Sequence, residues 1–289
     1  MSPNTPSFPP IGQPFIVLAT VDSTNNYAMA QAQEGLASHG AVYFAMEQTA
    51  GKGQRGKKWF SIPGENIALS AILQEMPLLV TNQFLLSASI ALASYDFLKK
   101  YSGNENICIK WPNDLYWQDR KAGGILIESF IGSPRPGGIE QTQSDKSDKS
   151  SINNADLYTS QSIPNTQLPT VRFGIVGIGI NINQSVFGEE MRNPVSLKQI
   201  TGKTFDVIHL AHELCECMNN RINALLTNRA SLIADEYNSV LYKLNQPITL
   251  KKGNIIFETT IQGVSIEGKL RTKDVIEREF TSGEVEWRI

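Results

Sequence analysis

The sequence predicts an α+β protein in which a large domain is followed by a small β domain. Its 289 residues are 41% hydrophobic, enough for one large globular unit, or for one large and one small. Short β-branched runs and longer stretches of helical spacing reach as far as residue 244. From Pro247 onward short strands alternate with glycines, a texture typical of a small β-barrel-like domain. We therefore expect a flexible N-terminus at 1–14, a large domain at 15–244 and a small domain at 245–289.

The first element is predicted to be a short buried strand at 15–20, where the run FIVLAT is apolar and partly β-branched. A polar cluster, Asp22 to Asn26, follows this strand and opens an Ala- and Gln-rich helix that reaches Glu34. The cluster has two interpretations, a helix N-cap alone or a set of binding residues.

The middle of the chain supplies most of the predicted sheet. Apolar runs predict strands at 41–48, 66–73, 107–111, 116–117, 124–130 and 171–183. Helical spacing of apolar residues predicts helices at 81–101, 204–228 and 231–244. Residues 132–170 contain SDKSDKSS and few large apolar side chains, so we expect a disordered insertion in a surface loop.

Charge and cysteine content limit the class of protein. The formal net charge is −2, which gives no global basic field for nucleic acid, so any anion site must be local. Three cysteines form no disulfide framework, and the N-terminus lacks the pattern of a signal peptide. No apolar run is long enough to span a bilayer, and we expect a soluble cytoplasmic protein.

Residues 110–128 place two cations, a carboxamide and a carboxylate on one predicted hairpin. These side chains are Lys110, Asn113, Asp114 and Lys121. Such a set suits polyphosphate chemistry, and its meaning depends on a glycine-rich segment before it and an asparagine-bearing strand after it.

The glycine-rich segment, GKGQRG at 51–56, follows a strand and matches GxGxxG. A dinucleotide fingerprint should open directly into a helix and be followed about 20 residues later by an acidic residue. Here KKWFSIPG follows, without helical periodicity, so we reject that fold. Taken alone, the segment favours a solvated basic turn. The alternative is a flexible cationic loop that approaches an anion, with Trp59 covering an aromatic base or capping the closed loop. The cations of this loop are Lys52, Arg55, Lys57 and Lys58.

The strand at 174–183 reads GIVGIGININ. Gly177 and Gly179 leave one face of the strand without side chains, as a ligand lying against a sheet requires. Asn181 shares that face because side chains two residues apart point the same way. A tightly packed strand without a ligand is the alternative.

Residues 209–217 contain two histidines and two cysteines, which are metal-ligating residue types, but their spacing does not indicate a metal site. On a helix, His209 and His212 share a face and Cys215 lies near them, but Cys217 points away. The protease signature HExxH fails because residue 216 is Glu, and we predict no metal site there.

Four segments in this order resemble those of biotin–protein ligases. They are DSTN at 22–25, EQTAGKGQRGKKWFS at 47–61, KWPNDLYWQDRKAGGILIE at 110–128 and GIGININ at 177–183. The resemblance covers roughly residues 15–289. It implies a mixed β-sheet with helices packed on one side, in a class II synthetase-like catalytic fold, and a small C-terminal SH3-like module.

The resemblance also implies a reaction with two halves. The carboxylate of biotin attacks the α-phosphate of ATP, in the presence of Mg²⁺, to give biotinyl-5′-adenylate and pyrophosphate. One lysine of a biotin carboxyl carrier protein, such as that of acetyl-CoA carboxylase, then attacks the adenylate and releases AMP. Neither step needs a covalent enzyme nucleophile, so the protein must align two anions and exclude water.

For biotin, the resemblance assigns a polar set to the head group, a loop that closes over it and one lysine at its carboxylate. The head-group set is Ser23, Thr24, Asn25 and Gln48, the loop positions are Lys52, Gly53 and Gln54, and the lysine is Lys121. A urea-like ring needs donors and acceptors, and these side chains supply both. We expect Lys121 to be the main electrostatic catalyst.

For the nucleotide, the resemblance assigns a second set. It consists of Arg55, Lys57, Trp59, Asn113, Gly179 and Asn181. The expected catalytic residues are Lys121, Asp114, Lys110 and Arg55, with Asp114 orienting or deprotonating the acceptor amine. No direct protein motif binds a metal; Mg²⁺ is expected with the ATP phosphates, near Asn113, Asp114 and Asn181.

The chain departs from the family pattern in two places. The family loop is commonly GRGRxGR, whereas here Lys52 and Lys57 replace arginines and Gln54 stands where an arginine is usual. Either Gln54 or the neighbouring Arg55 takes that role. Some relatives carry a winged helix-turn-helix before the DSTN motif, but only 21 residues precede Asp22. We therefore expect neither DNA binding nor a repressor role.

Two other functions remain open. A lipoate–protein ligase or octanoyl transferase shares the fold, but GKGQRG replaces its RRxxGGG motif and KWPND favours biotin. A non-enzymatic biotin or nucleotide sensor would not need both Lys121 and Asp114. The resemblance allows a homodimer and implies no membrane partner.

Overall fold

The structure is a computed structural model that describes most of the chain. It covers residues 8–74, 83–103, 106–132, 170–189, 191, 193–227 and 230–288. The predicted insertion at 132–170 therefore lies outside the described residues, apart from its two ends.

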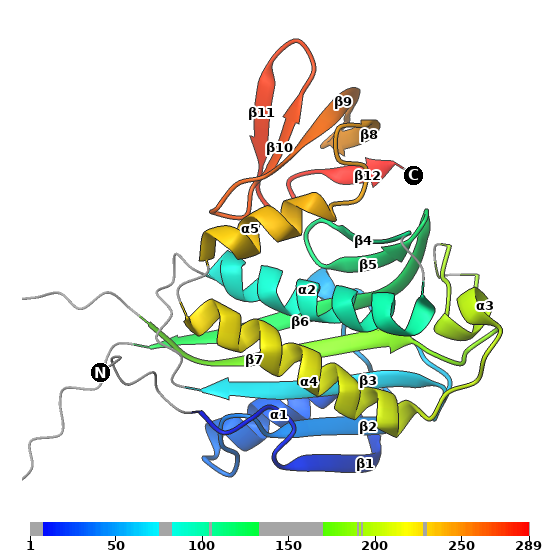
Figure 1. The fold of residues 1–289 in the computed structure, drawn as a ribbon, viewed down its shortest axis with the longest axis vertical. Helices are drawn as coiled ribbons and strands as arrows, with labels where there is room; N and C mark the ends of the chain where they lie inside the picture. Colours follow the sequence, from blue (N-terminus) through cyan, green and yellow to red (C-terminus); the bar gives the residue numbers. More distant parts are fainter. Residues whose placement is uncertain are drawn as a thin grey trace, which may run out of the picture.

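Seven strands form one large mixed sheet (Figure 1). In sheet order they are β1 (Phe15–Val21), β2 (Val42–Gln48), β3 (Asn66–Gln74), β7 (Thr170–Asn181), β6 (Arg120–Gly132), β5 (Asp114–Trp117) and β4 (Ile107–Lys110). β1 and β2 are parallel, and every other neighbouring pair is antiparallel. The predicted mixed sheet is confirmed.

One face of this sheet carries the main core and most of the helices. The helices are α2 (Gln83–Ser102), α3 (Leu197–Thr201), α4 (Val207–Leu226) and α5 (Ala230–Ser239). α2 and α4 lie along the sheet in Figure 1, and Val42, Phe44 and Leu69 of the strands share their apolar core. Each of these strand side chains is at most 1% exposed, because alternate residues of a strand point to one face.

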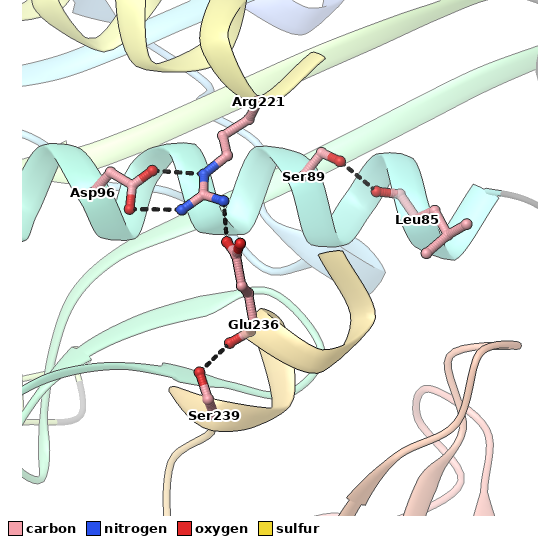
Figure 2. Close-up of polar contacts among 6 residues, drawn as sticks. All are labelled: Leu85, Ser89, Asp96, Arg221, Glu236 and Ser239. Carbon is pink, nitrogen blue, oxygen red and sulfur yellow. Dashed lines mark hydrogen bonds and ion pairs between the residues drawn. The ribbon is translucent and has the colours of Figure 1, made fainter. Parts of the chain in front are cut away.

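An arginine on α4 joins three of these helices (Figure 2). The Arg221 guanidinium donates to both carboxylate oxygens of Asp96 on α2, at 2.6 and 3.0 Å, and also to Glu236 on α5. These bonds raise the pKa of Arg221. The bidentate geometry fixes the relative positions of α2 and α4.

Helix α1 (Thr24–Gln33) lies on the opposite face, so the expectation that the helices pack on one side fails for this helix (Figure 1). Its Ala28 and Ala32 pack in a separate apolar cluster with Tyr43, Ile72 and Ile175. Small alanine side chains let the helix approach closely, and Ser23, its N-cap residue, makes no side-chain cap bond. The sequence pattern could not reveal this because the chain can pass from β1 to either face.

The C-terminal strands form a second, antiparallel sheet. In sheet order they are β11 (Glu277–Phe280), β10 (Leu270–Lys273), β9 (Ile255–Val264), β8 (Pro247–Lys252) and β12 (Glu286–Arg288). The second β unit is thus present where the sequence placed it, while the domain boundaries and the SH3-like character stay predictions. Asn238 of α5 exchanges two bonds with the backbone of Val264, which attaches this sheet to the helices.

Two local predictions differ from the structure. The helix predicted at 231–244 ends at Ser239, and Leu241 then forms a parallel bridge with Ile109 of β4. The backbone of Ile109 exchanges hydrogen bonds of 2.9 and 2.8 Å with Val240 and Tyr242. Helix α3 was not predicted, since it spans only five residues. Among the described residues, no helix combines the length and apolar character needed to cross a membrane.

Candidate functional site

The candidate site lies on the α1 face of the large sheet, where β3, β7 and β6 run side by side. Strand register aligns Ser70 with Gly177 and with Leu126, and Ala68 with Gly179 and with Gly124. The central strand of this face therefore has no side chains at two successive positions, as predicted.

The polar residues at the start of α1 form a connected cluster with β2 and β3. The amide and hydroxyl of Thr24 both lie near Gln48 Oε1, at 2.8 and 3.1 Å. The Ser70 hydroxyl lies 2.8 Å from Thr24 Oγ1 and 2.6 Å from Asn25 Oδ1. Ser23, Thr24 and Asn25 are at most 4% exposed, so this cluster is a buried set of donors and acceptors.

Ser70 is a site residue that the sequence analysis missed. It lies in the apolar run NIALSAIL, where one serine resembles a tolerated small residue. Its side chain faces away from the main core, on the face that also carries Gly177, and the alternation of the strand was the signal that could have revealed it.

The two glycines of β7 provide space for protein side chains. A Cβ at Gly177 would overlap the amide of Asn25, and one at Gly179 would lie 2.5 Å from the Trp59 ring. The Trp59 Nε1 is buried without a hydrogen-bond partner among the described residues. In this structure Asn25 and Trp59 therefore occupy the glycine face.

The glycine-rich segment turns back on itself and does not open into a helix. Lys52 and Lys58 pair as an antiparallel bridge, and the Gly53 amide donates to the Lys57 carbonyl at 2.7 Å. Arg55 has a φ of 58°, in the left-handed region. This hairpin-like loop agrees with our rejection of the dinucleotide fingerprint. With Leu126 and Glu128 the loop lines a half-open cavity of about 390 Å³.

The four loop cations are all exposed, but Lys52 and Arg55 have contacts with distant parts of the chain. Arg55 donates a weak hydrogen bond of 3.4 Å to Ser282, in the turn between β11 and β12. Its guanidinium fills the space that a Cβ at Gly283 would need. Arg55, which we expected to bind phosphate, thus contacts the β11–β12 turn in this structure.

Lys121 and Asp114 face each other across β5 and β6. Lys121 Nζ lies 2.6 Å from Asp114 Oδ1, and both side chains keep partial solvent exposure, 33% and 25%. A Cβ at Gly124 would lie 3.4 Å from each of these two atoms, so this glycine leaves room beside the pair. The structure brings together the two residues expected to carry the chemistry.

Lys110 and Asn113 have other partners in this structure. Lys110 Nζ donates to Tyr116 Oη at 3.1 Å and lies 5.3 Å from the ring centroid of Trp287 on β12. Asn113 exchanges hydrogen bonds with the backbone of Ile125, which braces the turn before β5. Lys110 therefore links the two sheets.

Asn181 supports the strand that carries Lys121. Its Nδ2 donates to the carbonyls of Val195, at 3.1 Å, and Lys121, at 3.4 Å. Its Oδ1 is buried and has no partner among the described residues. Asn181 thus contacts the backbone of Lys121.

The histidine and cysteine cluster on α4 is divided between surface and core. His209 is exposed, whereas Cys215 is 2% exposed in the main core. Burial raises the pKa of the Cys215 thiol to about 12. Within the described ranges, no group of three or more His, Cys, Asp or Glu side chains could hold a metal ion.

Residues 17–139 match the model of the Biotin/lipoate A/B protein ligase family. The match covers the part of the chain from β1 to the end of β6. Over 114 residues it is 41% identical to the bifunctional ligase/repressor BirA of Escherichia coli K12, covering 39% of this chain and 34% of that protein. Over 120 residues it is 41% identical to the biotin–[acetyl-CoA-carboxylase] ligase of Paracoccus denitrificans, covering 41% of this chain and 48% of that one. The chain thus spans about a third and about half of these two relatives.

The whole ligase fold is shared with a solved structure. The biotin protein ligase from Aquifex aeolicus in complex with biotin and ATP aligns with a TM-score of 0.69 and 24% identity. The alignment covers 95% of this chain and 98% of that one. The predicted fold class is therefore confirmed for the ligase domain and the second β sheet together.

Proposed function

We propose that this protein is a biotin–protein ligase that makes biotinyl-5′-adenylate from biotin and ATP and transfers biotin to a lysine of a carrier protein. One observation carries the proposal: a buried polar cluster and a lysine–carboxylate pair lie on the same glycine-lined face. The cluster contains Thr24, Asn25, Gln48 and Ser70, and the pair is Lys121 with Asp114. The names of the relatives support the same activity.

The cluster suits the ureido ring of biotin. A ureido ring offers two N–H donors and one carbonyl acceptor, and hydroxyl and carboxamide side chains match both. The dithiolane ring of lipoate has neither group, so buried polar atoms facing it would lose their hydrogen bonds with water. The cluster therefore favours biotin over lipoate or octanoate.

In the first half-reaction, a carboxylate oxygen of biotin attacks the α-phosphorus of ATP, and pyrophosphate leaves. Lys121 provides a fixed positive charge near the two anions and stabilises the charge that develops on the phosphate. Loop cations, Lys52 and Lys57 among them, add charge from the other side of the cavity.

In the second half-reaction, the neutral amine of the acceptor lysine attacks the carbonyl carbon of the adenylate, and AMP leaves. The amine must lose a proton as the amide forms, and we assign its acceptance to the carboxylate of Asp114, which pairs with Lys121. Neither half-reaction forms a covalent bond between the substrates and the ligase itself.

The residues present fit a magnesium ion that enters with ATP. Mg²⁺ is usually held by one or two carboxylates together with phosphates and water. Asp114 offers one carboxylate, and Asn181 Oδ1 is a buried oxygen without a described partner. When bound, the ion would reduce the negative charge of the phosphates, and Asp114 would be its protein ligand.

Location and assembly extend the proposal. The three free cysteines are compatible with a reducing compartment, and we place the reaction in the cytoplasm. A homodimer built through a sheet edge stays a prediction, which sedimentation at several protein concentrations tests.

The direct test is incubation with biotin, Mg-ATP and a purified biotin carboxyl carrier domain. We expect the carrier to gain the mass of one biotinyl group, and a carrier whose target lysine is changed to arginine to gain none. Modification with lipoate in place of biotin would support the lipoate ligase instead. Binding of biotin without pyrophosphate release would support the non-enzymatic sensor.

A further inference from the structure

Glu128 is not among the predicted site residues, but its carboxylate contacts two residues that are. Oε2 accepts a hydrogen bond of 2.8 Å from Asn25 Nδ2, at the start of α1. Oε1 lies 4.0 Å from Lys52 Nζ, in the glycine-rich loop. One side chain on β6 thus contacts both the buried polar cluster and the loop that covers the cavity.

The first contact determines which way the Asn25 amide points. Its Nδ2 faces two acceptors, the Glu128 carboxylate and the Leu126 carbonyl at 3.5 Å. Its Oδ1 faces the Ser70 hydroxyl at 2.6 Å. A flipped amide would direct its oxygen at an ionised carboxylate, which has no proton to donate. Glu128 therefore fixes the orientation of Asn25.

The position of the Asn25 side chain is restricted by its surroundings. It is 3% exposed, and its amide lies directly over Gly177, where a Cβ would overlap it. Through Ser70 its oxygen is connected to Thr24 and Gln48. The orientation set by Glu128 thus decides which donors and acceptors the cluster presents.

The second contact places a charge under the loop. Glu128 and the loop both line the half-open cavity of about 390 Å³. The Lys52 and Glu128 side chains are 44% and 36% exposed, so this pair is weak on its own and sensitive to salt. A loop closing over a bound ligand would bury the pair and strengthen it.

We propose that Glu128 is a positioning residue for biotin, which fixes the Asn25 amide and holds Lys52 of the closing loop. Recognition of the head group and closure of the loop then depend on one carboxylate. This inference rests on the proposed function, since it assigns a role toward the substrate proposed above.

The test is Glu128→Gln, which keeps the shape of the side chain but removes the charge, so that Asn25 has at most a neutral amide oxygen as its acceptor. We expect the dissociation rate of biotin and the KM for biotin to rise at least about tenfold, since a charge-assisted hydrogen bond is lost. We expect kcat and the KM for ATP to change by less than about twofold, because Glu128 does not touch the reacting atoms. Glu258→Gln, at an exposed acid on β9, is the matched control and should leave all four constants unchanged.

Two further variants separate the contacts. Glu128→Asp keeps the charge but shortens the side chain, so it should retain the salt dependence of biotin release while losing the Asn25 contact. Lys52→Met should speed release as well, and its effect should not add fully to that of Glu128→Gln.

The outcomes distinguish this inference from the proposed function. If the wild-type protein binds no biotin, the proposed function fails. If it binds biotin and Glu128→Gln, with unchanged thermal stability, releases it at the wild-type rate, only the role of Glu128 is overturned. An equal loss of kcat and gain in KM would also contradict a positioning role.

Discussion

Lys121 is held in place by a side chain and by backbone. The Asp114 carboxylate lies 2.6 Å from Lys121 Nζ. The backbone of Lys121 forms hydrogen bonds with the backbones of Asn193 and Val195. A cation fixed before the substrates arrive needs little reorganisation during the reaction, which is the condition for strong electrostatic stabilisation.

We predict that Lys121→Ala lowers the rate of adenylate formation by about 1,000-fold, the loss typical when one fixed group that stabilises transition-state charge is removed. The measurement is pyrophosphate release from biotin and ATP. Lys203→Ala, at an exposed position before α4, is the control. Near-normal release by the Lys121 variant would remove this residue from the reaction centre.

At this scale the sequence predicted residues that lie in compact motifs. Thr24, Asn25 and Gln48 do meet, and so do Asp114 and Lys121. For Ser70 the only signal was the alternation of its strand. Glu128 could not be predicted, because the register of β6 and β7 brings it to the cluster. The contact of Arg55 with Ser282 lay equally beyond local sequence, since the two residues are 227 positions apart.

Among the structural elements, α2, α4 and α5 are connected by the Arg221 network (Figure 2). We predict that Arg221→Met lowers the free energy of unfolding by about 1 kcal/mol, a modest value because Asp96 and Glu236 are more than a third exposed. Urea denaturation measures this change. Asp96→Asn, which removes one partner only, should lose less; an equal loss would show that Glu236 contributes nothing.

The contact between the glycine-rich loop and the β11–β12 turn gives a second prediction at this scale. Gly283→Ala would place a Cβ where the Arg55 guanidinium lies, at a φ of 84° that alanine rarely adopts. We expect the loop to detach and trypsin to cleave it faster at its lysines and arginine.

Ser282→Ala is the matched variant, because it removes a weak hydrogen bond and leaves the space for Arg55 open. It should be cleaved at close to the wild-type rate. Equal cleavage rates for wild type and Gly283→Ala would show that the contact does not hold the loop.

The elements themselves were predicted from periodicity with few errors. Apolar β-branched runs and helical spacing located β1 to β7, α1, α2 and α4 within a few residues. The placement of α1 on the far face and the early end of α5 depend on contacts between distant segments, such as Ile109 with Val240, which periodicity does not encode.

At the scale of the whole molecule, a buried histidine links stability to pH. His39 is 7% exposed, and the Gln74 amide donates to its Nδ1 at 3.0 Å. Burial lowers its pKa below the ordinary value of 6.5. The unfolded chain therefore binds a proton more readily than the folded protein as the pH falls through 6.5.

We predict that stability is constant just above pH 6.5 and falls as the pH drops from there toward the lower pKa of folded His39. Thermal melting between pH 5 and 8 measures this dependence. His39→Asn should flatten the profile in that window, and His209→Ala, at an exposed histidine, should not. The pKa values of Asp22 and Asp119 lie below the ordinary value of 3.8, so these two groups change the stability only in more acidic solution.

The docking of Arg55 on Ser282 also orders events during synthesis. At roughly 5–20 residues per second, the ribosome needs about 10–45 s to make the 227 residues that separate loop from turn. Through that interval the loop has no surface to rest on, although the strands of the large sheet are already emerging. A chain that stops before residue 281 never gains that surface. The β11–β12 turn would then have to fold before the glycine-rich loop can become ordered.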